Sequence, residues 1–378
     1  MSWPRCASAA GWVLPVCSRS PEGVVAPPTD PEVVAVRPDE QLDLSRLEPW
    51  LRAHLPHSEG PLTLQQFGGG HANLTYLLRF GNSEYVLRRP PLGPIAPTAH
   101  DMRREHRVLE RLGKAFPLAP QSYALCTDPA ILGVDFHVME RRHGIVIRRD
   151  LPAELEGRPE LNRRIGEMIV DVLADLHRVP PETVGLEELG RPEGFAQRQV
   201  EGWGRRWQAA KDQEVADVDR MLRWLEEAVP DPQVTALLHN DYKLDNVMLA
   251  AADPATPVAV LDWDMTTRGD PLMDLGYLLN FWNEAGDDPR WRQGSRMPTH
   301  HDGFPTRAEV VERYAGRTGF DLDHIAWYHV FGVFKLVVIV QQIYIRFRRG
   351  QTQDQRFAGY DERARDLARK GVTLIDAG

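Results

Sequence analysis

The chain has 378 residues, of which 42% are hydrophobic and 26% charged, and its formal net charge is −9. This length fits one large or two modest domains. The acidic excess argues against nonspecific nucleic-acid binding, which needs basic residues to neutralise phosphates. Cys6, Cys17 and Cys126 have neither a disulfide framework nor metal-ligand spacing, which fits a reducing cytoplasm.

Residues 1–44 are rich in Pro, Ala and Ser and have no clear periodicity. A short apolar patch at 9–16 resembles a signal peptide only faintly, because it contains Pro15 and lacks a persuasive cleavage site. We expect a disordered tail over 1–44, or a start codon assigned too far upstream, with the folded chain beginning at residue 45.

A glycine-rich turn at 68–70 lies between two runs with strand character, 62–67 and 74–80. Glycine lets the backbone approach phosphates closely and present its N–H groups to them. We predict that Gly69 and Gly70 contact a nucleotide in this way, although glycine-rich turns also serve as ordinary hairpin connections.

The next predicted strand, 85–88, ends in Arg88 and contains no lysine. We predict that Arg88 holds the α- and β-phosphates of a nucleotide through its planar fork of donors. A helix predicted over 98–112 carries Glu105 on its apolar face, where an acid is costly unless it is paired. Arg88 is its natural partner. The alternatives are a solvated Arg88 and a Glu105 paired only within its own helix.

A strand predicted at 133–140 leads into a connection between two lobes. From the order of elements alone, the backbone groups of Met139, Glu140 and Arg141 are expected to meet the adenine edge of a nucleotide.

The most informative segment is His-Asn-Asp-Tyr-Lys-Leu-Asp-Asn at 239–246. Phosphoryl transfer needs a carboxylate near the acceptor hydroxyl, oxygen ligands for Mg²⁺ and positive charge near the moving phosphate. Asp241 is the predicted base, Asn246 a predicted Mg²⁺ ligand and Lys243 the cation directed at the γ-phosphate. His239 is expected to brace the loop.

Two short strands are predicted at 247–250 and 258–261, joined by a turn rich in Asp, Pro and Thr. Their pairing would place Asp262 beside Asn246. Asp262 is therefore the predicted main Mg²⁺ carboxylate, with Asp264 as a helper. A simple polar loop with solvated acids is disfavoured, because four positions of the preceding segment match a catalytic loop and an acid follows at hairpin distance.

Further along the chain, Asp274 is expected to accept hydrogen bonds from backbone N–H groups of the catalytic loop. The apolar run at 330–345 predicts a buried core helix and not a membrane span, because Lys335, Gln341 and Gln342 interrupt it. Three arginines follow it, which either end the helix favourably or anchor an anionic substrate: Arg346, Arg348 and Arg349.

This order of motifs resembles the aminoglycoside phosphotransferase and choline kinase superfamily. It is most similar to the phosphotransferase domains fused to, or encoded near, acyl-CoA dehydrogenases, on the evidence of residues 85–91, 260–277 and 334–357. The resemblance implies an α+β, bilobal protein-kinase-like fold. A small antiparallel β N-lobe would span 45–140, and a mostly helical C-lobe would span 141–378.

The resemblance also implies ATP or GTP with Mg²⁺, and a small-molecule hydroxyl acceptor, with hydroxylated acyl groups as one candidate class. By matching position it gives Asp241 the catalytic role, and Asn246 and Asp262 the metal. Arg88 departs from the lysine usual in aminoglycoside kinases, although it suits this subgroup. No nucleic-acid or membrane partner is expected.

Two alternatives stay open at this point. A protein kinase is disfavoured because the metal strand ends Asp262-Trp263-Asp264, where protein kinases have Asp-Phe-Gly, and no Ala-Pro-Glu segment follows. Arg88 leaves the second alternative open, which is a pseudokinase or partner-binding module that binds nucleotide without turnover.

Overall fold

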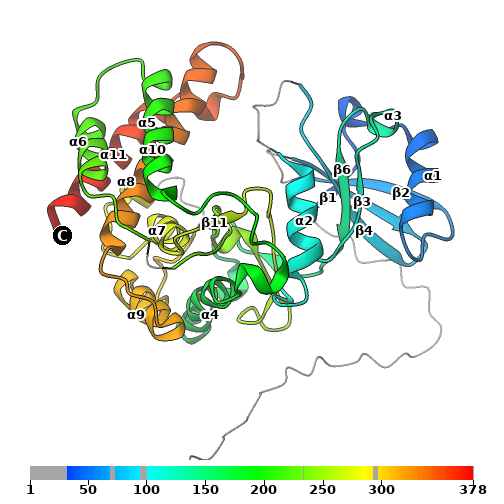
Figure 1. The fold of residues 1–378 in the computed structure, drawn as a ribbon, viewed down its shortest axis with the longest axis horizontal. Coiled ribbons are helices and arrows are strands. Elements are labelled where there is room, and N and C mark those ends of the chain that lie inside the picture. The colour runs from blue at the N-terminus through cyan, green and yellow to red at the C-terminus, as the bar shows by residue number, and fades with distance from the viewer. Residues whose placement is uncertain (1–31, 69–72, 94–99, 233, 293–296, 378) are drawn as a thin grey trace, which may run out of the picture.

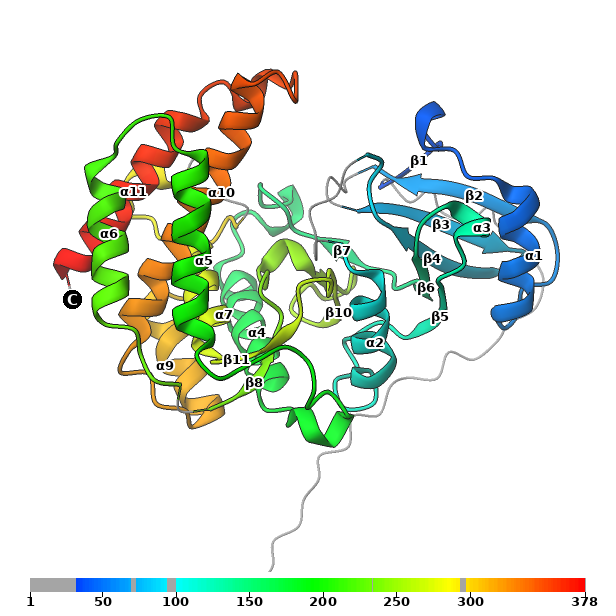
Figure 2. The same ribbon diagram turned by 45° about the horizontal axis from the view of Figure 1, so that its top comes forward.

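The structure is a computed structural model that describes residues 32–68, 73–93, 100–232, 234–292 and 297–377. Gly69 and Gly70, predicted to contact a nucleotide, lie outside the described residues, as do residues 1–31 of the predicted tail. The described chain forms two lobes, one built on a sheet and one mostly helical (Figures 1 and 2). The predicted bilobal, protein-kinase-like α+β fold is confirmed.

The N-terminal lobe is built on a six-stranded antiparallel sheet with strand order β1-β2-β3-β4-β6-β5. Helix α1 covers one face, where Leu47 and Leu51 are fully buried, and α2 packs against β5 and β6 on the other side. The strands and helices of this lobe are β1 Val33–Val34, α1 Leu44–His54, β2 Leu62–Phe67, β3 Leu74–Phe80, β4 Ser83–Arg89, α2 Met102–Leu112, β5 Ser122–Cys126, α3 Pro129–Leu132 and β6 Phe136–Glu140, with a 3₁₀ turn η1 at Pro38–Glu40.

The structure differs from the predicted disordered tail over residues 32–44. Strand β1 pairs with β2 in this stretch, and the Tyr76 hydroxyl donates to the Glu40 carbonyl at 2.8 Å. The backbone N–H of Arg37 donates to the side chain of Gln66. These contacts add an edge strand to the sheet. The proline-rich composition of this stretch gave no sign of that strand, although edge strands tolerate proline.

The C-terminal lobe packs its helices around one large apolar core that also contains α2. Its helices are α4 Pro159–His177, α5 Phe195–Ala210, α6 Ala216–Glu227, α7 Leu272–Phe281, α8 Pro289–Arg292, α9 Arg307–Thr318, α10 Ile325–Arg348 and α11 Tyr360–Ala377, with 3₁₀ turns η2 Ala153–Leu155, η3 Pro181–Val184, η4 Leu244–Asn246 and η5 Gln355–Phe357. Its strands are β7 Ile145–Val146, β8 Ala236–Leu238, β9 Val247–Leu249, β10 Pro257–Val260 and β11 Thr267–Gly269.

Helix α10 is long and apolar enough to cross a membrane by length and composition, and it is the one such helix in the described part of the chain. Most of it is buried against α7, α11 and α5. It approaches α7 closely where Gly332 faces Gly276, because a Cβ at either glycine would overlap the backbone of the other helix. The helix therefore belongs to the protein core, as its polar interruptions predict.

Two small sheets place the candidate site at the base of the N-terminal lobe. In one, β9 and β10 pair as an antiparallel hairpin in which Val247 lies opposite Val260. In the other, β8 pairs with β11, so that the segment after β8 starts from buried structure. The catalytic-loop segment thus lies between β8 and β9, beside the end of β10.

Candidate active site

A cleft of about 590 Å³ opens between the two lobes, and its lining includes most of the predicted site residues. Those that line it are Arg88, Glu105, Met139, Glu140, Asp241, Lys243, Asn246 and Asp262. The predicted residues thus come together from strands, a helix and a loop that lie far apart in the sequence. A cleft at a lobe boundary that carries a few convergent polar groups is a common form of ligand site.

The loop after β8 is anchored from below by a buried carboxylate. Asp274, at the first turn of α7, accepts the backbone N–H of His239 at 2.6 Å and that of Asn240 at 2.8 Å. Burial alone would raise the pKa of Asp274, but His177 and the loop donors lower it below its ordinary value. The carboxylate is therefore ionised, and the predicted anchoring contact is present.

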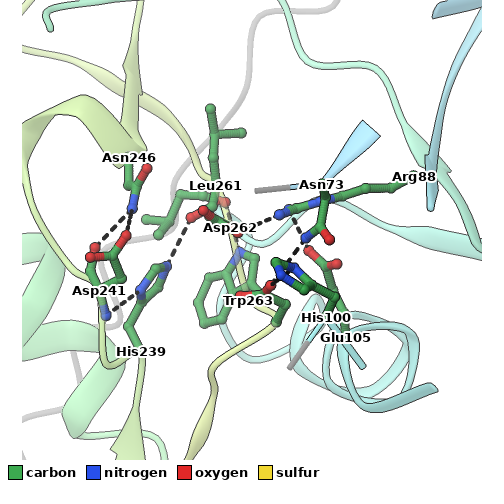
Figure 3. Close-up of polar contacts among 12 residues, drawn as sticks. Asn73, Arg88, His100, Glu105, His239, Asp241, Asn246, Leu261, Asp262 and Trp263 are labelled. Carbon is green, nitrogen blue, oxygen red and sulfur yellow. Dashed lines mark hydrogen bonds and ion pairs between the residues drawn. The ribbon is translucent and has the colours of Figure 1, made fainter. Parts of the chain in front are cut away.

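His239 joins the loop to the segment that follows β10. Its Nε2 donates to the Leu261 carbonyl at 2.8 Å, and its Nδ1 accepts the backbone N–H of Asp241 at 3.3 Å (Figure 3). Burial lowers the pKa of this imidazole, so it is neutral, in agreement with one donating and one accepting nitrogen. His239 therefore sets the spacing between Asp241 and the residue that follows Leu261, which is the predicted metal ligand Asp262.

The Asp241 carboxylate contacts two side chains of its own loop. Lys243 forms an ion pair with it. The amide nitrogen of Asn246 donates to its Oδ2 at 3.0 Å (Figure 3). Burial alone would lower the pKa of Lys243, but Asp241 and Asp245 raise it above its ordinary value. The loop thus holds the predicted base Asp241, the Lys243 ammonium and the Asn246 amide as one local unit.

Asp262 follows β10, and the backbone N–H of Leu261 donates to the Asn246 carbonyl at 2.8 Å. The predicted neighbourhood of Asn246 and Asp262 is therefore present. The backbone of Asp262 has a φ of 69°, which non-glycine residues rarely adopt. Such a conformation persists only where the surroundings impose it, and functional sites are where it concentrates.

Arg88 links the two lobes across the cleft. One of its terminal nitrogens lies 2.7 Å from Glu105, and the other forms an ion pair with Asp262 (Figure 3). Glu105 also lies 3.1 Å from the Nε2 of His137. Burial alone would raise the pKa of Glu105, but Arg88 and His137 lower it. The predicted Arg88–Glu105 pair is present, and the pairing with Asp262 was not foreseen.

Asp264 has a different environment from Asp262. It accepts the side-chain amide of Asn73 at 3.0 Å and lies 3.8 Å from the Nδ1 of His100. Burial and the nearby charge of Asp262 raise the pKa of Asp264. Sequence reasoning missed Asn73 and His100. The polar Asn73 directly before a buried strand was the available signal, whereas nothing in the sequence marks His100.

At the predicted hinge, Met139 and Glu140 both line the cleft. The backbone N–H of Glu140 already donates to the Gln121 carbonyl at 2.8 Å. That N–H is thus already paired within the protein. The expectation that backbone groups of this stretch meet the adenine edge stays a prediction.

The donor set fits Mg²⁺ in character. The nitrogen of Asn246 is turned toward Asp241, so its amide oxygen points away from that carboxylate (Figure 3). Asp262 adds a carboxylate, and no cluster of three or more His, Cys, Asp or Glu side chains that could hold a metal occurs within the described ranges. Mg²⁺ commonly takes one or two protein oxygens and completes its shell with water and phosphate. Asn246 and Asp262 are thus suited to a metal that arrives with a nucleotide.

On the C-terminal side the cleft has an apolar wall, contributed by α7 and α10. We use this term for the side chains Tyr277, Phe281, Leu336, Ile339, Val340 and Ile343, all of which line the cleft. Arg346, Arg348 and Arg349 are not among the described lining residues. Arg348 instead donates to the Tyr344 hydroxyl at 2.7 Å, which favours the reading of these arginines as a cationic helix end.

Residues 63–324 match the phosphotransferase enzyme family, also called APH. Curated relatives include acyl-CoA dehydrogenase family member 11 of Mus musculus, which is 32% identical over 91% of this chain and 44% of its own length. Family member 10 of the same organism is 31% identical over 85% of this chain and 30% of its own length. The chain spans less than half the length of these relatives.

Solved structures of aminoglycoside phosphotransferases are also similar to this chain. A Ralstonia eutropha protein assigned to the aminoglycoside phosphotransferases is 29% identical, with a TM-score of 0.77 over 89% of this chain and 99% of its own. Aminoglycoside phosphotransferase APH(4)-Ia, solved as a complex with AMP-PNP and hygromycin B, is 19% identical, with a TM-score of 0.55 over 86% of this chain and 98% of its own. The second likeness concerns the fold alone.

Proposed function

Because the chain belongs to the phosphotransferase enzyme family, we propose that it transfers the γ-phosphate of ATP or GTP to a hydroxyl of a small molecule. The observation on which this proposal rests is that Asp241, Asn246 and Asp262 all line one interlobe cleft. These are the base and the oxygen ligands that phosphoryl transfer requires.

In the proposed reaction, the acceptor oxygen forms a bond to the γ-phosphorus while the bond from that phosphorus to the bridging oxygen breaks. The Asp241 carboxylate accepts the acceptor proton, and the nucleoside diphosphate leaves. Lys243 lies beside Asp241 and would place positive charge near the moving phosphate. Arg88 would release Asp262 and hold the α- and β-phosphates.

Asn246 and Asp262 would hold Mg²⁺, which neutralises phosphate charge when bound. Asp264 is a weaker candidate ligand, because its pKa is raised and it already contacts Asn73. Glu105 would keep Arg88 in place, and the segment at Met139 and Glu140 would bound the adenine. Gly69 and Gly70 keep their predicted role at the phosphates.

For the acceptor, we propose a hydroxylated acyl compound. The apolar wall shares the cleft with Asp241, and a hydrocarbon chain buried against it would gain roughly 25 cal/mol per Å². A polycationic aminoglycoside has no comparable segment to bury there. The curated relatives whose names include acyl-CoA dehydrogenase agree with this choice. We also propose that the protein is cytoplasmic.

The first test is Asp241→Asn. We expect Mg·ATP binding to change little, while turnover falls by about 10²–10⁴-fold, the range for loss of a positioned base. Asp253→Asn is the matched control, because Asp253 lies between β9 and β10 and pairs with Arg164 outside the cleft. Unchanged turnover in Asp241→Asn would remove this residue from the mechanism.

The acceptor is tested with a panel of hydroxyacyl-CoAs of short and medium chain length, choline-like alcohols, aminoglycosides and sugars, followed by diphosphate release. Fastest release with a hydroxyacyl-CoA is the expected result. Mg·ATP binding without release for any acceptor would instead favour the pseudokinase alternative. Phosphate found on a serine or threonine of an added protein would favour a protein kinase.

A further inference from the structure

Lys335 is a buried cation in the middle of α10, and nothing in the proposed reaction uses it so far. Its Nζ donates to the backbone carbonyl of Asn240 at 2.9 Å. The same ammonium lies 4.0 Å from the centre of the Tyr277 ring, within the range of a cation–π contact. It therefore contacts the catalytic loop on one side and a member of the apolar wall on the other.

The carbonyl that Lys335 contacts belongs to the peptide unit directly before Asp241. A peptide unit is planar, so its C=O and N–H ends turn together. At the other end of this unit, the N–H of Asp241 donates to the Nδ1 of His239 at 3.3 Å. Lys335 and His239 thus hold the two ends of the plane from which the Asp241 side chain departs.

This plane would not stay in position by backbone preference alone. Asn240 has a φ of 65°, in the left-handed region that costs an L-residue free energy, although asparagine tolerates it better than most. Its own N–H is held by Asp274 at 2.8 Å and its side chain by the Met265 carbonyl at 2.9 Å. These two contacts act before the peptide unit that leads to Asp241, whereas Lys335 acts on the carbonyl of that unit itself, opposite the N–H held by His239.

The ammonium is charged at neutral pH. Burial lowers the pKa of Lys335 to about 8, and the charges of Asp241 and Asp274 act in the opposite direction. Lys243 and Arg206 add to the lowering. A charged donor to a carbonyl is stronger than a neutral one, so the contact can maintain the orientation of the peptide.

We propose that Lys335 is a positioning residue for Asp241: it fixes the peptide plane before the base and so directs the carboxylate toward the acceptor hydroxyl. This inference rests on the proposed function. Through Tyr277, the same ammonium also ties the loop to the wall against which the acceptor would lie.

The competing explanation is that Lys335 merely fills the core as a satisfied buried cation. The chain offers a matched control for that role. Lys370 on α11 is also buried, donates to the Asn280 carbonyl at 2.8 Å, and has its pKa lowered to about 8 by burial. Its hydrogen bond goes to α7 and not to the catalytic loop, so Lys370→Met reports the structural effect alone.

The experiment compares Lys335→Met, Lys335→Arg and Lys370→Met with the wild type. Two readouts are taken well below the melting temperature: diphosphate release with the fastest hydroxyacyl-CoA of the panel and with water as acceptor, and Mg·ADP affinity by calorimetry. Lys335→Met should lower kcat about 10–10²-fold, as expected for a misplaced base, with Mg·ADP affinity nearly unchanged. Lys335→Arg should recover much of the loss, and Lys370→Met should keep kcat.

Three outcomes would overturn the inference. One is a Lys335→Met enzyme with wild-type kcat, and another is a parallel loss of kcat in Lys370→Met. The third is loss of Mg·ADP affinity together with kcat. If Lys335→Met does not fold, Lys335→Gln takes its place and must lose kcat relative to Lys335→Arg. A wild-type protein that transfers phosphate to no acceptor, water included, refutes the proposed function as well, whereas the first three outcomes leave it standing.

Discussion

Replacing Glu105 with glutamine tests how the N-terminal lobe holds Arg88, the cation of the proposed nucleotide site. Glu105 is fully buried, and it lies 2.7 Å from Arg88 and 3.1 Å from the His137 Nε2. Glutamine has nearly the same shape, but it is neutral and has only one acceptor oxygen. One of the two donors must then face an NH₂ group.

The expected loss of stability follows from the burial of Glu105 and from the contact that Arg88 keeps. Removing one member of a buried ion pair commonly costs 3–5 kcal/mol, because the other charge stays in a dry environment. Arg88 would keep its second contact, with Asp262, so we expect the low end, about 3 kcal/mol of unfolding free energy. Arg88 would also turn further toward Asp262, and Mg·ATP affinity should fall about tenfold, which corresponds to about 1.4 kcal/mol.

Urea unfolding and calorimetry with Mg·ATP measure the two effects. Asp135→Asn is the control, because Asp135 pairs with Arg103 on the same helix as Glu105, this pair is exposed, and such pairs contribute little. A Glu105→Gln protein as stable as this control would refute the argument from burial. Wild-type Mg·ATP affinity in a destabilised Glu105→Gln protein would show that Glu105 stabilises the lobe without positioning Arg88.

Three further predictions concern the proposed metal ligand Asp262, the crossing of α7 and α10, and the buried Lys370. Asp262→Asn should raise the Kd for ATP at least tenfold when Mg²⁺ is present and much less in EDTA, as calorimetry would show. Gly276→Ala would place a Cβ 2.4 Å from the Tyr328 carbonyl. It should lower the free energy of unfolding, measured in urea, by about 1–3 kcal/mol or more. The control Gly316→Ala, in open space on α9, should be neutral or stabilising. Because the pKa of Lys370 is lowered from 10.5 to about 8 in the folded state, the cost of burying its charge is present below pH 8 and disappears as the pH rises toward 10.5. Unfolding free energy should therefore gain up to about 2 kcal/mol from this lysine between pH 7.5 and 9.5, and the gain should be missing in Lys370→Met.

The sequence was sufficient to predict those contacts of the site that join neighbouring elements of the chain. The two strands after residue 246 could be predicted to pair because a turn joins them, and their pairing puts Asp262 next to Asn246. The Arg88–Glu105 pair could also be predicted, although the two residues lie on different elements. An acid on an apolar helix face must find a cation, and the preceding strand offered one.

Other parts of the site depend on how the two lobes and the core helices meet. The Arg88–Asp262 ion pair, the Asn73–Asp264 hydrogen bond and the Lys335 contact with Asn240 join residues between 95 and 191 positions apart. Periodicity shows which face of an element is buried, but not which face of another element it will meet. Packing decides those partners. Only the folded core brings α10 against the loop that contains Asn240, and the sheet of the N-terminal lobe against the segment that follows β10.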